Sequence, residues 1–333
     1  MELEGGYDNL EGGYDNLEGG YDNLEGGYDG NDLDGGAVGG ANGGARKRMY
    51  KEKHCSPGEN DVEGSCLDDD IIIKVGKAIN RLANNNQKLD KIDLSREPED
   101  IHGDICAQIS KISKCSSEAC WQKIKSLMKE LGSDKEEFID SFKPQIPKEW
   151  IKDYNEWLST FEIEDCLEQH LDADKNFYFY GAVPIDFSKC SVSDLCGFDM
   201  KKHLDKEETK IGIVFNTDPS TKDGQHWISL YMDLGKHNND YPGIYYFDSF
   251  GRKPPKEIKE LIKKTQDQGK KCNCEPYYFY NDYSYQKRNS QCGMYAIHFI
   301  KKMLEGLSFE EYLNTKLTDQ HMIDLRKDYF IKI

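Results

Sequence analysis

Residues 226–232 read His-Trp-Ile-Ser-Leu-Tyr-Met, a stretch in which nearly every side chain is large and apolar. Alternate residues of a β-strand point to opposite faces of the sheet. Two sets of side chains result, with Trp227, Ser229 and Tyr231 on one face and Ile228, Leu230 and Met232 on the other. The stretch therefore predicts a strand with two different faces, both largely apolar.

Further strands and helices are predicted on both sides of this strand. Strand patterns occupy residues 177–180, 211–216, 243–247 and 277–280, and helical patterns occupy residues 162–170, 256–268, 293–304 and 319–328. Strands and helices in separated runs are typical of the α+β class. We therefore predict an α+β core over residues 151–333.

The residues ahead of this core follow the period of a helix instead. Apolar residues recur at helical spacing in three places, at 72–82, 105–112 and 124–131. Gly132 and two prolines at 144 and 147 are signals that end helices. We predict a helical arm over residues 49–150.

The first 45 residues differ from the rest in charge and composition. They hold 11 acidic residues, no Lys or Arg and 15 of the 30 glycines, and Leu-Glu-Gly-Gly-Tyr-Asp-Asn repeats at 3–9, 10–16 and 17–23. Two glycines in each repeat are incompatible with a coiled coil. One Leu and one Tyr bury too little surface to offset the entropy of folding. We predict a disordered acidic tail over residues 1–48.

Charge and hydropathy argue against several classes of function. The net charge is −17, and subtracting the −11 of the first 45 residues leaves only −6 for the remainder, so no basic surface for nucleic acid is expected. Apolar runs such as Ile71-Ile72-Ile73 are far shorter than the roughly 18 residues of a membrane span. The residues after Met1 form neither a basic nor an apolar region, so we expect neither a secretory leader nor a membrane partner.

The 11 cysteines are an odd number, and with no leader expected we predict free thiols in a reducing compartment rather than disulfides. The spacing of Cys272 and Cys274 is too tight for a zinc ribbon, and Cys115 and Cys120 lack a second pair at a matching distance. We predict no structural metal.

Four residues of the last half of the chain could form a catalytic centre. Cys292 stands where a loop turns into the predicted helix 293–304, and N–H groups at a helix N-terminus stabilise a thiolate. His226 begins a strand and could take the thiol proton, while Asp248 follows the neighbouring strand and could orient the imidazole. Gln286, with the Cys292 N–H, could bind a developing oxyanion.

Each of these residues alone has a more ordinary explanation. A cysteine at a helix start is usually a small buried apolar residue, and an aspartate after a strand commonly belongs to a turn. Seven other histidines compete with His226, among them His298, which is expected to face away from Cys292 and pack. Only the ordered set of four is informative.

This ordered set resembles the pattern shared by adenovirus protease and the SUMO-processing proteases, and most of all that of the polyprotein-processing cysteine protease of African swine fever virus. The matching positions are His226-Trp227, Asp248, Gln286 and Cys292-Gly293. The resemblance covers about residues 110–333, and nothing similar covers the repeat tail. One departure is that the swine fever protease has an asparagine where Asp248 stands.

The resemblance implies a viral cysteine protease with an adenain-like core, in which a central mixed sheet is flanked by helices, and no metal or cofactor. It implies Cys292 as nucleophile, His226 as base and then acid, Asp248 as orienting group and Gln286 as oxyanion donor. Trp227 and Gly293 would be supporting residues. It further implies cleavage of viral structural polyproteins after Gly-Gly during virion maturation, in the virion and the host cytoplasm.

The tail carries seven Gly-Gly pairs, of which four precede Tyr and three precede Ala. With the implied specificity, the tail would be a substrate of its own protease or a tethered ligand; the alternative is an extension grown by repeat slippage. Three other functions stay open. They are a deconjugase for ubiquitin-like proteins that end in Gly-Gly, an acyltransferase on the same fold, and a non-catalytic capsid-associated protein.

Overall fold

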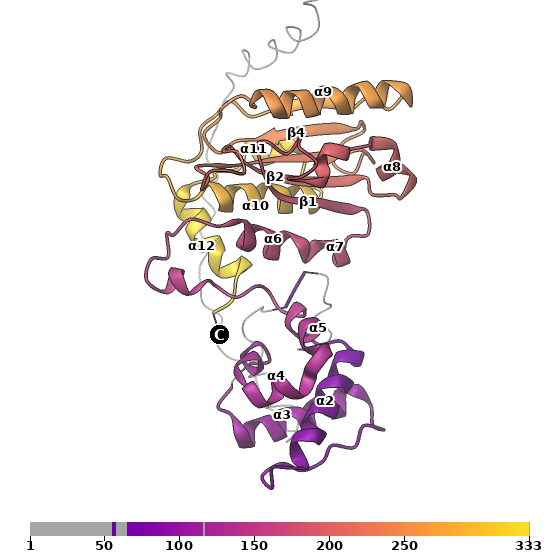
Figure 1. Ribbon diagram of the computed structural model, residues 1–333, viewed down its shortest axis with the longest axis vertical. Coiled ribbons are helices and arrows are strands. Elements are labelled where there is room, and N and C mark those ends of the chain that lie inside the picture. The colour runs from indigo at the N-terminus through magenta and orange to yellow at the C-terminus, as the bar shows by residue number, and fades with distance from the viewer. Residues whose placement is uncertain (1–54, 58–64, 116, 333) are drawn as a thin grey trace, which may run out of the picture. The chain divides into compact units, whose positions relative to one another are not determined.

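The computed structural model describes residues 55–57, 65–115 and 117–332, and Figure 1 shows its helices and strands. The predicted tail over residues 1–48 lies outside the described residues. A five-stranded sheet forms the centre of the predicted core, with its strands in sequence order. They are β1 (Phe177–Pro184), β2 (Lys210–Asn216), β3 (Trp227–Asp233), β4 (Gly243–Phe247) and β5 (Tyr277–Tyr280).

The sheet is mixed. The pairs β1–β2 and β4–β5 are parallel, whereas β2, β3 and β4 run antiparallel to one another. Parallel neighbours need a crossover connection. The chain supplies one through α8 (Met200–Asp205) between β1 and β2, and another through α9 (Lys256–Lys271) between β4 and β5.

Both faces of β3 are buried, each in a different apolar cluster. Trp227 and Tyr231 pack with residues of α6 (Thr160–Glu168) and α10 (Cys292–Leu304), while Ile228 and Leu230 pack with residues of α9. Figure 1 shows α9 over one face of the sheet and α10 over the other. The predicted α+β class and the division of these side chains between two faces of the strand are confirmed.

Several shorter helices complete this core: α7 (His170–Ala173), α11 (Phe309–Leu313), α12 (Asp319–Tyr329), and the 3-10 helices η3 (Lys148–Ile151) and η4 (Asp194–Gly197). The predicted helix at 162–170 begins at Thr160, because Ser159 and Glu162 form a capping box ahead of it. No helix in the described part of the chain is both long and apolar enough to cross a bilayer.

The helical arm has an apolar cluster of its own. Its helices are α2 (Asp69–Ala83), α3 (Pro98–Ile112), α4 (Lys125–Leu131) and α5 (Lys135–Asp140), with the 3-10 helices η1 (Ala119–Lys123) and η2 (Gly132–Asp134). The predicted periodicity is confirmed, since Val75, Ile79 and Ile105 are fully buried in this cluster. Ile331, which follows α12, also belongs to it, and its backbone bonds to Pro144 and Ile146.

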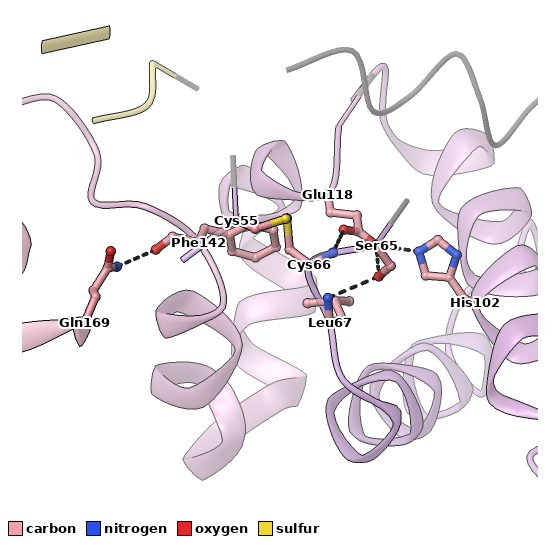
Figure 2. The surroundings of a disulfide bond; sticks show 8 residues. All are labelled: Cys55, Ser65, Cys66, Leu67, His102, Glu118, Phe142 and Gln169. Atoms are coloured by element: carbon pink, nitrogen blue, oxygen red, sulfur yellow. Dashed lines mark hydrogen bonds and ion pairs between the residues drawn. A yellow bond between two sulfur atoms is a disulfide. The ribbon is translucent and has the colours of Figure 1, made fainter. Parts of the chain in front are cut away.

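A buried carboxylate joins the start of the arm to α3, as Figure 2 shows. Glu118 accepts the Ser65 hydroxyl at 2.7 Å and the Cys66 N–H at 2.8 Å, and it also bonds to His102 Nε2. Gln169 Nε2 donates to the Phe142 carbonyl at 2.7 Å. Because Gln169 lies between α6 and α7 of the core and Phe142 follows α5, this bond links the two regions.

The prediction that the cysteines are free thiols is wrong for eight of the eleven. The disulfides are Cys55–Cys66, Cys115–Cys120, Cys190–Cys196 and Cys272–Cys274, and the free thiols are Cys106, Cys166 and Cys292. The partners are only 2 to 11 residues apart, so local turns bring them together. The parity of the cysteine count contains no information about such local proximity.

Candidate active site

His226 and Asp248 meet at one edge of the sheet. His226 directly precedes β3 and Asp248 directly follows β4, and the two strands are antiparallel, with Ser229 opposite Phe247. Antiparallel pairing places the start of one strand beside the end of the next. His226 Nε2 accordingly lies 2.7 Å from Asp248 Oδ1, and both side chains are buried.

The Asp248 carboxylate is held by more than the imidazole. Its Oδ1 also accepts the Phe250 N–H at 2.8 Å, and the Phe250 ring lies 4.9 Å from the imidazole ring, centroid to centroid. The Asn281 side chain accepts the Asp248 N–H at 2.9 Å and donates to the Asp248 carbonyl at 2.7 Å. The orientation of the acid is therefore fixed by its own turn and by the end of β5.

Cys292 is the first residue of α10, its thiol is buried, and it is one of the groups that raise the pKa of the His226 imidazole. Burial lowers the pKa of His226, but the hydrogen bonds and negative charges of Asp248 and Cys292 outweigh it and raise the pKa to about 9. The first N–H groups of a helix have no carbonyl partner within it, and they favour negative charge at the Cys292 sulfur.

Gln286 is buried and held from two sides. Its Oε1 accepts the Ser249 hydroxyl at 2.7 Å, and its Nε2 donates to the Arg288 carbonyl. Its backbone N–H donates to the Ser249 carbonyl at 2.9 Å, next to Asp248. Since an amide nitrogen carries two hydrogens, one of them is left over for a further acceptor.

Trp227 and Gly293 fix the approach of α10 to a loop that precedes α6. The Trp227 indole N–H donates to the Leu158 carbonyl at 2.9 Å. A Cβ added to Gly293 would lie 2.9 Å from the Leu158 Cβ and 3.4 Å from the Trp227 Cδ1. Only glycine permits this contact, which explains Gly293 directly after Cys292.

A cleft of about 850 Å³ opens beside Trp227. Its lining includes Trp157 and Leu158 on one side and the loop at residues 216–224, which leads to His226, on the other. Asp186 fastens this loop by accepting the Ser220 N–H at 2.8 Å and the Ser220 hydroxyl at 2.9 Å. The cleft therefore lies beside the residue that follows His226, and Asp186 holds the loop that forms one of its walls.

The Ulp1 protease family, C-terminal catalytic domain, matches residues 192–333, a range that holds all four predicted site residues. Over 296 residues the chain is 30% identical to a protein of Acanthamoeba polyphaga mimivirus that is named as a thiol protease; the match covers 83% of this chain and 92% of that protein. The chain belongs to the Ulp1 protease family. It is a cysteine protease.

This Ulp1-family protease is also similar to a cysteine protease of African swine fever virus. The identity is 23% over 233 residues, which cover 65% of this chain and 83% of that protein. The crystal structure of the swine fever virus protease superposes with a TM-score of 0.63 at 20% identity and covers 86% of this chain and 98% of that one. The two proteins share a fold, and the family resemblance found in the motifs is confirmed.

Sequence reasoning missed the residues that support the protease site. Ser249 and Asn281 hold Gln286 and Asp248, respectively, through buried hydrogen bonds. Ser249 could have been suspected, because it directly follows Asp248. Asn281 had no signal in the sequence, because its role depends on the parallel pairing of β5 with β4.

Proposed function

We propose that Cys292 is the nucleophile, His226 the base and then the acid, and Asp248 the orienting group of an endopeptidase. Gln286 and the Cys292 backbone N–H would bind the oxyanion. The observation that carries the proposal is the 2.7 Å hydrogen bond between His226 and Asp248, beside the buried Cys292, which opens α10 and helps to raise the pKa of His226. Covalent hydrolysis requires a nucleophile, a base that takes its proton, and a group that orients the base.

The reaction then needs no group outside the chain except substrate and water. Once the thiol proton is on His226, the sulfur attacks the peptide carbonyl, and the electron pair moves to the oxygen beside Gln286. The imidazolium gives its proton to the amine as the C–N bond breaks, and a thioester with Cys292 remains. Water, deprotonated by His226, then attacks the thioester, and the sulfur leaves as the acid forms.

The proposed substrates carry Gly-Gly before the bond that is cut and are structural polyproteins of a virus. Trp157 and Trp227 both line the cleft. Flat aromatic walls close to an extended substrate backbone favour residues that lack a Cβ. The mimivirus and swine fever virus relatives are both viral proteins, and we propose that the protease acts in the virion and the host cytoplasm, at the site of viral assembly.

The repeat tail is the nearest source of such sequences. With seven Gly-Gly pairs in the first 45 residues, it offers either cleavage sites or a tethered competitor for the cleft. A site on the same chain as the cleft has an effective concentration on the order of 1 mM, which is enough for a weak ligand. We propose that the protease cuts its own tail after some of these pairs.

A second candidate within the protease class is a deconjugase for ubiquitin-like proteins that end in Gly-Gly. The match of residues 192–333 to the Ulp1 protease family favours it. An aldehyde or vinyl-ester probe built on a ubiquitin-like C-terminus should label Cys292 rapidly if this is the activity. If this probe labels Cys292 no faster than a free Gly-Gly peptide probe does, the deconjugase is ruled out and the endopeptidase is favoured.

The deciding experiment compares wild type and Cys292→Ala on matched peptides, one with Gly-Gly-Ala and one with Ala-Ala-Ala at the same place. We expect cleavage of the first peptide by wild type alone. Intact mass after incubation should show fragments of the tail in wild type and the full chain in the variant. Cleavage by Cys292→Ala would overturn the assignment of Cys292 as the nucleophile. Equal cleavage of both peptides by wild type would overturn the Gly-Gly specificity.

A further inference from the structure

Two buried charged residues of α12 contact the segment between Gln286 and Cys292. Asp319 is the first residue of α12, and Arg326 lies seven positions later. Seven residues are close to two helical turns, so both side chains lie on the same side of α12. Asp319 is 9% exposed and Arg326 is fully buried. The helix therefore presents a negative and a positive group to one stretch of the active site.

Asp319 holds the residues that directly follow Gln286. Its Oδ2 accepts the backbone N–H of Lys287 at 3.0 Å and of Arg288 at 2.8 Å. The Arg288 carbonyl is the acceptor for the Gln286 side-chain amide. The Tyr295 hydroxyl of α10 lies 3.3 Å from the other carboxylate oxygen. Asp319 thus fixes the peptide unit on which the orientation of the Gln286 amide depends.

Arg326 holds the residue that directly precedes Cys292. Its Nε donates to Gln291 Oε1 at 3.2 Å, and one of its terminal amines donates to the Glu156 carbonyl at 2.7 Å. The guanidinium carbon lies 4.2 Å from the centre of the Trp150 ring. Gln291 is the N-cap residue of α10 and Glu156 precedes Trp157 of the cleft, so one guanidinium joins both.

These contacts do not make Arg326 a stabilising ion pair. Its hydrogen-bond partners are an amide oxygen and a backbone carbonyl, both uncharged. Burial lowers the pKa of Arg326 to about 10, which still leaves it charged at neutral pH. A buried cation with neutral partners is costly to stability. What the contacts provide is a fixed position for Gln291 and hence for the start of α10.

Beyond its end, α12 is itself anchored. The Ile331 N–H donates to the Pro144 carbonyl at 2.8 Å, and the Ile331 carbonyl accepts the Ile146 N–H at 2.9 Å. Both ends of the element are thus held, by Asp319 at its start and by this short ladder after its end. A helix that is held at both ends can keep the segment that it contacts in one position.

We propose that Asp319 and Arg326 are positioning residues of the protease, and that α12 braces both ends of the segment 286–292 so that the Gln286 amide and the Cys292 N–H point at one site. The inference rests on the proposed function, because it assigns a task to the Gln286 amide. Neither residue touches the substrate. Both act through the backbone and side chains between Gln286 and Cys292.

The Asp319 end is tested by comparing Asp319→Ala with Asp319→Asn. Asparagine keeps an oxygen that can accept the N–H groups of Lys287 and Arg288, whereas alanine does not. We expect Asp319→Ala to lower kcat by about 10- to 100-fold, the usual cost of a small misplacement, with KM within about twofold. Asp319→Asn should restore kcat to within about threefold of wild type. Equal loss in both variants would overturn the proposal.

A double-mutant cycle with Gln286→Ala separates positioning from a general structural role. If Asp319 acts through the Gln286 amide, adding Asp319→Ala to Gln286→Ala should lower kcat further by less than about threefold, since the amide is already gone. If Asp319→Ala lowers kcat as much in the Gln286→Ala protein as in wild type, the proposal is wrong. If Gln286→Ala alone has no effect on kcat, the proposed function fails, and the cycle shows this separately.

The Arg326 end is tested on the reactivity of Cys292. Arg326→Met removes both hydrogen bonds, and we expect the rate of Cys292 alkylation by iodoacetamide and kcat to fall together. Arg326→Lys should retain one bond and an intermediate rate. Matched controls on the exposed side of α12 are Asp324→Ala and Lys327→Met, which should change neither rate by more than about twofold. A loss in the controls equal to that in Arg326→Lys would overturn the proposal.

Discussion

The arm and the core each contain a cysteine, a histidine and a buried acid in contact. In the core they are Cys292, His226 and Asp248. In the arm, Cys106 Sγ lies 3.8 Å from His102 Nε2, which also bonds to Glu118. In both clusters burial lowers the pKa of the histidine, while hydrogen bonds to the cysteine and the acid raise it to about 9.

The two clusters differ in what surrounds the sulfur. Cys106 lies in the middle of α3, where the backbone N–H groups are used within the helix, whereas Cys292 opens α10. The sulfur of Cys106 lies 4.0 Å from His102 Nδ1 and 3.8 Å from Nε2, and Nε2 is also bonded to Glu118. None of the residues that line the described cleft belongs to the arm.

The acids differ as well. Glu118 also accepts hydrogen bonds from Ser65 and Cys66 and so fastens the start of the arm, whereas Asp248 is bonded to its own turn and to the imidazole. The arm cluster therefore holds the fold, whereas the core cluster holds the proposed base beside a cleft. The comparison teaches that the residue types alone do not make a site. The free helix N-terminus, the cleft and the spare amide of Gln286 do.

The largest expected difference is between the two cysteines. Cys292→Ala should lower kcat/KM on a Gly-Gly-Ala peptide by on the order of 10⁵-fold, because the nucleophile is lost. Cys106→Ala should leave kcat/KM within about twofold of wild type. Peptide hydrolysis followed by mass spectrometry measures both, with Cys166→Ala as a second control. Strong inactivation by Cys106→Ala would mean that the arm cluster takes part in the reaction.

The two histidines should separate activity from stability. His226→Gln should lower kcat by about 10⁴-fold, since the base is lost. His102→Gln should leave the kcat of the folded enzyme unchanged but lower the free energy of unfolding by about 3 kcal/mol, because Glu118 loses its buried partner. Urea unfolding and initial rates on the same preparations measure the two effects. The reverse outcome would exchange the roles of the clusters.

A smaller difference is expected for the acids. Asp248→Asn keeps an oxygen that can accept from His226 Nε2 if the amide is oriented by the Phe250 N–H, so kcat should fall by about 10-fold, less than for loss of the base. Glu118→Gln should leave kcat unchanged, because the acid acts only on the fold of the arm. Rates at saturating peptide test both. A loss for Asp248→Asn as large as that of His226→Gln would show that the negative charge itself is needed.

Most of the sheet and the site could be predicted because they depend on local patterns. The alternation in residues 226–232 places Trp227 and Ile228 on opposite faces, and the antiparallel return to Asp248 then follows from the position of the next strand. The helix start at Cys292 is visible as a loop followed by an apolar run. These signals need no knowledge of distant contacts.

The supporting residues could not be predicted for the opposite reason. Asp319 and Arg326 act on residues 31 to 35 positions away, and Arg326 also on Glu156, 170 positions away. No periodicity shows which distant backbone groups a charged side chain will meet. The disulfides were not predicted for a related reason. Turns such as the one between Cys190 and Cys196 are too short to give a recognisable sequence pattern.

The smallest effect we predict is a dependence of stability on pH in the arm. The folded-state pKa of His102 is about 9, above the ordinary value of 6.5, and burial, which lowers it, is outweighed by its bonds to Cys106 and Glu118. A raised pKa contributes stability that is complete below pH 6.5 and is lost as pH rises through 9. The difference in free energy of unfolding between the parent and His102→Gln should therefore shrink by on the order of 2 kcal/mol from pH 6 to pH 9.5.

Urea unfolding at a series of pH values measures this difference. Both proteins should carry Cys292→Ala, which would prevent the proposed self-cleavage, and Cys106→Ser, which removes the neighbouring thiol. Glu118 then remains as the charged group that faces His102, and the pair at His226 and Asp248 is present in both proteins and cancels. If the difference in free energy of unfolding stays constant over this pH range, the pKa of His102 is not raised on folding. The arm histidine would then differ from His226 in this property.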